Sequence, residues 1–127
     1  MTKEERDLVW RDLVARIPYG VKVKDTYYTS LEPTTPWLVD HILQEVRLYA
    51  DENWQSIEHI KPYLRPMSSM TEEEDRCFRD VSNHSHYGLP CEQYAGSIDW
   101  LNSHHFDYRR LIEKGLALEA PEGMYKL

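Results

Sequence analysis

The chain has 127 residues, 41% of them hydrophobic, and a formal net charge of -7. This length predicts one domain, residues 1–127, and four tryptophans with nine tyrosines exclude the aromatic-poor composition of a disordered chain. Residues 71–127 carry 6 basic against 11 acidic side chains, which disfavours a nucleic-acid partner because phosphates are held chiefly by Lys and Arg.

Apolar runs are short throughout the sequence, and none approaches the roughly 20 residues that a membrane span needs. The charged start MTKEERD does not resemble a secretory leader. Cys77 and Cys91 are too few for a disulfide framework in a chain of this size. We therefore expect a cytoplasmic protein with reduced thiols and no membrane partner.

A capping box opens the sequence, with Thr2 as the N-cap and Glu5 three residues later. Apolar residues recur at helical spacing after it, until Pro18 and Gly20 end the pattern. The pattern predicts an amphipathic helix at about residues 3–16.

Residues 21–28 then alternate between apolar and polar positions, which predicts a strand. Residues 37–44 are ambiguous: Thr35 followed by proline fits a helix start, yet the same residues also alternate. We expect a short element of undecided type there, then a strand at 45–50 and a strand or extended segment at 57–64.

A second capping box, Thr71 with Glu74, predicts a helix whose core face is formed by Cys77, Phe78 and Val81. The stretch NHSHYGLPCEQYAG, residues 83–96, is predicted to be a loop. Two short helices should follow at 98–104 and 108–114, capped by Ser97 and Asp107 and ended by Gly115, before a last short strand in LALEAP.

These elements predict an α+β fold. Residues 1–65 should form an N-terminal amphipathic helix and a small antiparallel β unit. Residues 66–127 should be mainly helical, with a hairpin of short helices and a final short strand.

Histidines and cysteines cluster in two stretches, NHSHYGLPC and HHFD, and provide candidate metal ligands at His84, His86, Cys91 and His104. Neighbouring residues on a helix point about 100° apart, so His104 and His105 do not share one ion easily. No HExxH or CxxC motif is present, so we predict no metal and no cofactor. A metal- or cysteine-dependent hydrolase that uses these loops remains an alternative.

Aromatic and basic side chains crowd the joint of the two last helices. A hairpin of this size also suggests a nucleic-acid-binding module, but acidic residues flank its second helix. We favour a partner protein, and the candidate partner-binding residues are Trp100, His104, His105, Arg109 and Arg110.

Three stretches, ARIPYGVKV, IKPYLRPMSSMTEEE and DWLNSHHFDYRRLIEKGLALEAP, together cover more than a third of the chain. They resemble a family of small uncharacterised proteins of gut anaerobic bacteria, their phages and their mobile elements. Glycine often stands in that family where this chain has Arg110. The resemblance implies a small N-terminal β unit and a C-terminal helical hairpin, and it brings no activity and no site residue.

No catalytic constellation is present in the sequence, and the acidic C-terminal half suits a basic partner. We therefore predict a small non-enzymatic accessory protein, related to phages or mobile elements, that works through protein–protein interaction. A hydrolase and a nucleic-acid-binding module remain the alternatives.

Overall fold

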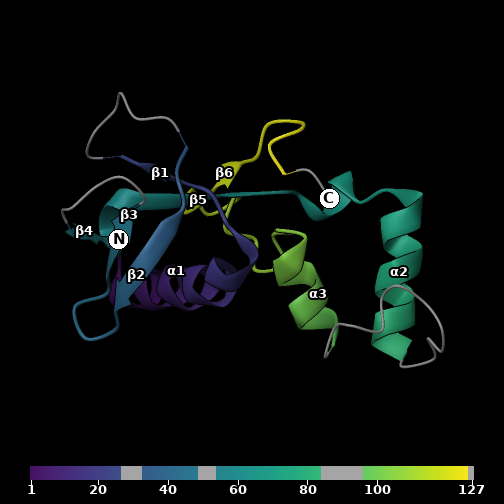
Figure 1. Cartoon of the computed structure of the whole chain (residues 1–127), viewed down its shortest axis with the longest axis horizontal. Coiled ribbons are helices and arrows are strands. Elements are labelled where there is room, and N and C mark those ends of the chain that lie inside the picture. Colours follow the sequence, from purple (N-terminus) through teal and green to yellow (C-terminus); the bar gives the residue numbers. More distant parts are fainter. Residues whose placement is uncertain (27–32, 49–53, 84–95, 126–127) are drawn as a thin grey trace.

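The computed structural model describes residues 1–26, 33–48, 54–83 and 96–125. Within these residues the chain forms three α-helices and two three-stranded sheets, with short 3-10 turns between them (Figure 1). The predicted α+β class is confirmed. Among the described helices, none combines the length and the apolar character that crossing a membrane requires.

Helix α1 spans Lys3–Arg16, as its capping box predicts. The Thr2 hydroxyl accepts from the Glu5 amide at 3.1 Å, and the Glu5 carboxylate accepts from the Thr2 amide at 3.0 Å. Val9 and Leu13 point into the core and are fully buried. The helix ends in the 3-10 turn η1, Ile17–Tyr19, where Pro18 and the left-handed Gly20 stop it.

The first sheet has the order β1-β5-β6 and consists of β1, Val23–Asp25, β5, Ile60–Leu64, and β6, Leu118–Glu119. Strands β1 and β5 are antiparallel, whereas β6 runs parallel to β5. The last strand of the chain therefore lies beside the central strand. The predicted strand over 21–28 is shorter in the structure, and its residues 27 and 28 lie outside the described residues.

The second sheet is an antiparallel meander with the order β2-β3-β4: Pro36–Asp40, Glu45–Leu48 and Trp54–Ser56. Residues 36–40 are therefore a strand, and the helical interpretation of 37–44 is wrong. The Asp40 carboxylate accepts from the amides of Ile42 and Leu43, and this bonding closes a tight turn where a helix would continue. Buried Val46 pairs with Val39 on the face that packs against α1.

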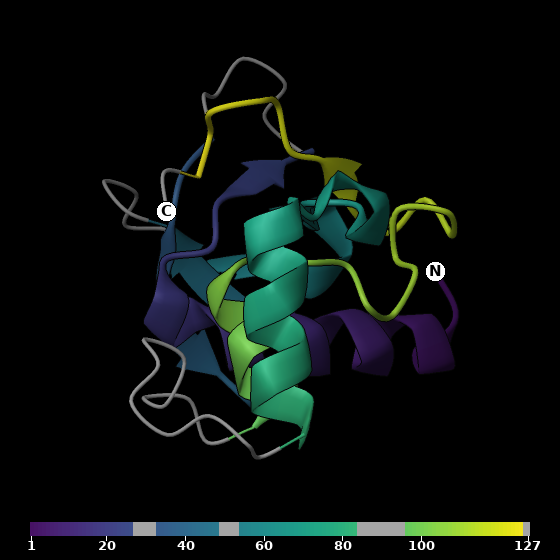
Figure 2. The same cartoon turned by 90° about the vertical axis from the view of Figure 1, so that its right-hand side faces the viewer.

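Residues 57–64, predicted as one strand or extended segment, divide into the 3-10 turn η2, Ile57–His59, and strand β5. A further 3-10 turn, η3, Met67–Ser69, leads to helix α2, Glu72–Asn83. Helix α3, Ser97–Ser103, packs beside α2, at the end of the molecule away from the sheets (Figures 1 and 2).

A second helix of the predicted hairpin is not formed, because residues 108–114 fold into turns. Arg110 has a φ of 59°, which is incompatible with a right-handed helix. Asp107 does act as a local cap, since its carboxylate oxygens accept from the amides of Leu111 and Ile112 at 2.9 Å. Gly115, with a φ of 74°, ends this segment in the left-handed conformation expected of it.

Two apolar clusters form the interior. The larger joins α1, both sheets and the segment 111–117, and the smaller joins α2 and α3 around Trp100 and Phe106. A buried ionic group connects them: Arg16 donates to both carboxylate oxygens of Asp12 and, at 2.6 Å, to the carbonyl of Phe106. Charges taken out of water need partners of this kind, so these bonds fix α1 against the C-terminal half. The Nη1 atom of Arg16 is buried without a hydrogen-bond partner among the described residues.

Candidate functional site

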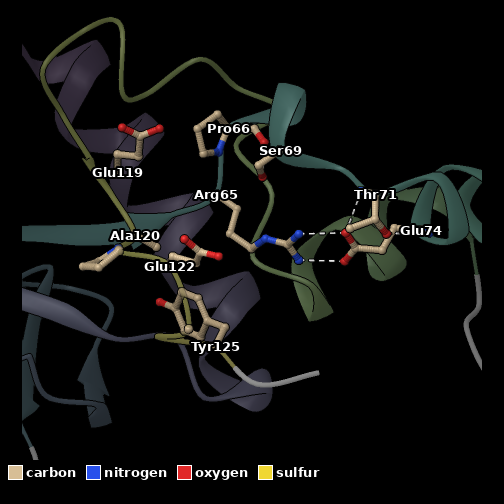
Figure 3. Close-up of a pocket in the computed structure, with 11 residues that line it drawn as sticks. Arg65, Pro66, Ser69, Thr71, Glu74, Glu119, Ala120, Glu122 and Tyr125 are labelled. Carbon is tan, nitrogen blue, oxygen red and sulfur yellow. Dashed lines mark hydrogen bonds and ion pairs between the residues drawn. The ribbon is translucent and has the colours of Figure 1, made fainter.

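A cavity of about 720 Å³ opens where the end of β5 meets the C-terminal segment (Figure 3). Its volume lies within the range of small-molecule pockets. One wall comes from the residues after β5 and the start of α2, and the other comes from the segment that follows β6. The lining residues are Arg65, Pro66, Ser69, Thr71, Glu74, Glu119, Ala120, Pro121, Glu122, Gly123 and Tyr125.

Arg65 crosses the floor of this cavity and is held on three sides. Both of its terminal nitrogens donate to the Glu74 carboxylate at 2.7 Å, and its guanidinium lies 4.2 Å from the centre of the Phe106 ring. Its backbone amide donates to the carbonyl of His105. Such a two-pronged pairing is the strong form of a charged hydrogen bond, and it occupies the guanidinium of Arg65.

Glu74 is fixed by the capping box of α2 as well as by Arg65. Its carboxylate accepts from the Thr71 amide at 3.0 Å. Burial alone raises the pKa of Glu74, but the hydrogen bonds from Arg65 and Thr71 outweigh that effect and lower the pKa below its ordinary value. Glu74 is therefore ionised at neutral pH and committed to an internal pair.

Two further carboxylates line the cavity. Glu119 and Glu122 are exposed, and neither forms an ion pair with any described residue. In Figure 3, Glu74 lies on one side of Arg65, while Glu122 and Tyr125 lie on the other. The lining thus carries three carboxylates against one guanidinium, so its potential favours a cation.

Tyr125 forms the end of the cavity wall and is held by the strands beneath it. Its hydroxyl accepts from the Lys22 amide at 2.8 Å and donates to the Tyr63 carbonyl at 2.7 Å. Burial raises the pKa of Tyr125 to about 12, so this phenol stays protonated. The Tyr125 ring stacks on the His105 ring with 3.7 Å between their centroids. Tyr125 also lines the cavity.

His105 lies behind this wall and is 3% exposed. Its φ of 64° and its stacking on Tyr125 place the ring inside the protein. Burial is the main cause that lowers the pKa of His105 to about 4, and the positive charge of Arg16 adds to it. Its Nδ1 has no hydrogen-bond partner among the described residues.

The other predicted partner-binding residues are spread around this region. Trp100 is fully buried, stacks on His104 at 4.0 Å and donates from its indole to the sulfur of Cys77. Arg109 donates to buried Asp12 at 2.6 Å. Of the five residues, Arg110 alone has an exposed side chain, and none of the five lines the cavity.

The candidate metal ligands do not form a site within the described residues. His84, His86 and Cys91 lie outside the described residues. The Nδ1 atom of His104 lies 3.0 Å from the Trp100 carbonyl, and burial lowers the pKa of His104. In the four described ranges, no group of three or more His, Cys, Asp or Glu side chains is arranged to hold a metal ion.

Cys77 is disulfide-bonded, which overturns the expectation of reduced thiols. The chain has one other cysteine, Cys91, which lies outside the described residues. The number of cysteines led to the wrong expectation, because it does not report how close two sulfurs come in the fold. A bonded sulfur is not a thiolate nucleophile, so Cys77 in this state does not serve the alternative of a cysteine-dependent hydrolase.

Sequence reasoning missed the residues that line the cavity. The capping box locates Thr71 and Glu74, but the pairing of Glu74 with Arg65 crosses the turn η3 and leaves no periodic signal. Glu119 and Glu122 reach the same wall only because β6 pairs with β5. The available signal was the acidic excess of residues 71–127, which predicts the sign of the charge at the site but not the position of the site.

Comparisons of the chain with protein-family models, with curated proteins and with solved structures found no match.

Proposed function

We propose that this protein is a small non-enzymatic interaction protein that binds a basic segment of a partner protein. A lysine or arginine side chain of the partner enters the cavity between Arg65 and Tyr125. In keeping with the family resemblance, the role is that of an accessory protein of a phage or mobile element. The observation that carries the proposal is that two lining carboxylates, Glu119 and Glu122, form no ion pair with the described residues and lie beside an arginine that is already neutralised.

The internal pairing of Arg65 determines the charge of the ligand. An arginine with a free guanidinium would recruit a carboxylate or a phosphate. Here Glu74 already occupies both terminal nitrogens of Arg65. The remaining charges of the lining are the carboxylates of Glu119 and Glu122, and they favour a cation.

Tyr125 provides the second element of recognition. An ammonium or guanidinium group gains stabilisation over an aromatic ring, more so when water is partly excluded. The ring is fixed before binding by two hydrogen bonds and by the stacked imidazole of His105. A prearranged aromatic ring and two carboxylates suit a long basic side chain, whose charged group lies at the end of an apolar stem.

Catalysis has less support from the same geometry. Glu74 is bound to Arg65, Tyr125 stays protonated at neutral pH, and His105 is stacked behind the wall. General acid–base chemistry needs a group with a pKa near neutrality that faces the substrate. The described lining supports binding better than proton transfer.

Calorimetric titration with a tetralysine peptide tests the proposal. Glu119→Gln combined with Glu122→Gln should weaken binding by roughly threefold to tenfold, since each exposed ion pair contributes modestly. The matched control combines Glu4→Gln with Glu113→Gln, two exposed glutamates outside the cavity, and removes the same charge.

An acetyllysine peptide of the same length separates site binding from general attraction to an acidic protein. We expect it to bind far more weakly than tetralysine to the wild-type protein. Equal losses in both double variants would mean that the peptide responds to net charge alone, and the cavity would then not be the site.

A cytoplasmic location remains part of the proposal, and it has a consequence for Cys77. Disulfides are rare in a reducing cytoplasm, whereas Cys77 is disulfide-bonded in the structure. Maleimide trapping of the thiols in acid-quenched cells decides the matter: labelling of Cys77 supports a cytoplasmic location, and full protection argues for an oxidising compartment.

A further inference from the structure

The face of sheet β2-β3-β4 that points away from α1 carries a row of unusual side chains. We call it the outer sheet face and define it by Trp37, Leu38, Asp40, Glu45, Arg47, Trp54 and Ser56. Cross-strand pairs share one face of a sheet, and the register pairs Leu38 with Arg47 and Arg47 with Trp54. Val46 and Leu48, on either side of Arg47, point inward and are buried.

Large apolar side chains on this face are open to solvent. Trp37 is 50% exposed, Trp54 is 42% exposed and Leu38 is 39% exposed. The register shifts between Pro36 and Leu38, so Trp37 lies at an irregularity of β2, and its indole nitrogen donates to the Leu48 carbonyl at 3.2 Å. Contiguous exposed apolar side chains mark interaction surfaces.

Arg47 lies between the two indoles and has an incomplete set of partners. Its guanidinium is 5.4 Å from the Trp37 ring centre and 6.0 Å from that of Trp54. Its Nε is buried without a hydrogen-bond partner, and Arg47 forms no ion pair within the described part of the chain. Such a group gains from a partner that supplies an anion.

Glu45, two residues earlier on the same strand, carries a negative charge of the kind that Arg47 would need. It shares the outer sheet face, because its register partners are Asp40 and Ser56 in the next row. Residues i and i+2 of a strand lie roughly 7 Å apart, and Glu45 and Arg47 form no direct ion pair in the described part of the chain. Glu45 forms no side-chain ion pair with the described residues either.

We infer that the outer sheet face is the interface of a symmetric homodimer. A two-fold axis that runs across the strands, between the Arg47 row and the Glu45 row, places Arg47 of one copy opposite the partner's Glu45. By symmetry the reverse pair forms as well. The same operation stacks the two sheets with their strands aligned, which is the common sheet-on-sheet arrangement.

Side chains in the two rows also complement each other in size and charge under this operation. Trp54 of one copy faces the partner's Ser56, a small residue that leaves room for an indole. Leu38 faces the partner's Asp40, whose carboxylate is turned towards the amides of its own turn. The exposed indoles are thereby covered, and each opposite charge gains a partner.

Charge reversal tests this arrangement through the dimer dissociation constant, measured by sedimentation equilibrium from micromolar to millimolar concentrations. We expect the wild-type protein to dimerise. Arg47→Glu and Glu45→Arg should each weaken the dimer at least about a hundredfold, because each change brings two like-charged contacts together. The combined swap of both residues should restore dimerisation.

Glu113→Arg, an exposed position outside the outer sheet face, is the control and should leave the dissociation constant unchanged. Circular dichroism checks that each variant is folded, and the swapped variant keeps the test valid if a single reversal perturbs the sheet. A wild-type protein that stays monomeric overturns the inference. A dimer that tolerates both single reversals, or that the swap does not restore, places the interface elsewhere and also overturns it.

Discussion

Acidification should destabilise this protein between pH 6.5 and about 4 through one buried histidine. The pKa of His105 falls from an ordinary value of 6.5 to about 4 in the folded chain, while the unfolded chain keeps the ordinary value. Between these limits the unfolded state binds a proton that the folded state excludes. Stability is therefore fully present above the unfolded pKa and declines as the pH falls.

The magnitude follows from the two pKa values. Each unit of difference corresponds to about 1.4 kcal/mol, so a drop from pH 7.5 to pH 5 should remove about 2 kcal/mol from the free energy of unfolding. The cost has a structural origin, because the His105 ring is 3% exposed and is stacked on Tyr125. The positive charge of Arg16 increases it.

Urea denaturation at a series of pH values measures this slope. His105→Phe keeps an aromatic ring against Tyr125 but cannot bind the proton, so its free energy of unfolding should change by about 2 kcal/mol less over the same pH range. Ile42→Gln, at a position that is 93% exposed and carries no titratable group, should keep the wild-type slope. Equal slopes for the wild type and His105→Phe would show that the folded protein accepts a proton on His105 near its ordinary pKa.

Three further substitutions test the local structure by urea denaturation at pH 7. Arg110→Gly should raise the free energy of unfolding by about 0.5–1 kcal/mol, because a φ of 59° costs any residue with a Cβ; a loss of stability would refute the left-handed conformation. Asp12→Asn should lower it by about 3 kcal/mol or more, since buried Arg16 loses its counter-charge and Arg109 its partner; a loss below about 1 kcal/mol would indicate a hydrated pair. Thr71→Ala should lower it by about 1 kcal/mol through loss of the N-cap, and an unchanged value would mean that the cap contributes nothing.

Local signals in the sequence predicted the elements that local chemistry determines. The capping boxes at Thr2 and Thr71 located the starts of α1 and α2 because both partners of each box lie within one turn of chain. The predicted core residues of α2 also lie where expected, in the cluster around Trp100. The acidic excess predicted the charge of the candidate site.

Two segments differ from the sequence prediction for reasons that the spacing of their own residues does not show. Residues 36–40 became a strand because β3 is there to pair with them, although their spacing fits a helix equally well. Residues 108–114 have helix-forming spacing, yet Arg110 in the left-handed region breaks the helix. Glycine adopts this conformation without strain, so an arginine at this position gives no local sign of it.

Burial also reversed the expected roles of the aromatic residues. Trp100 lies in the core, whereas Trp37 and Trp54 are exposed on a sheet face that no hydrophobic pattern singled out. Periodicity alone does not tell which face of an isolated meander is covered, because that depends on where α1 packs. The exposed tryptophans therefore required the three-dimensional arrangement.

Chemical-shift mapping with the tetralysine peptide shows whether a basic side chain binds in the cavity. We expect the changes in backbone amide shifts of ¹⁵N-labelled protein to concentrate at residues 65–74 and 119–125, the two walls of the cavity. The acetyllysine peptide should leave these shifts unchanged. Changes spread over the acidic surface, or centred on any other segment, would contradict binding in the cavity.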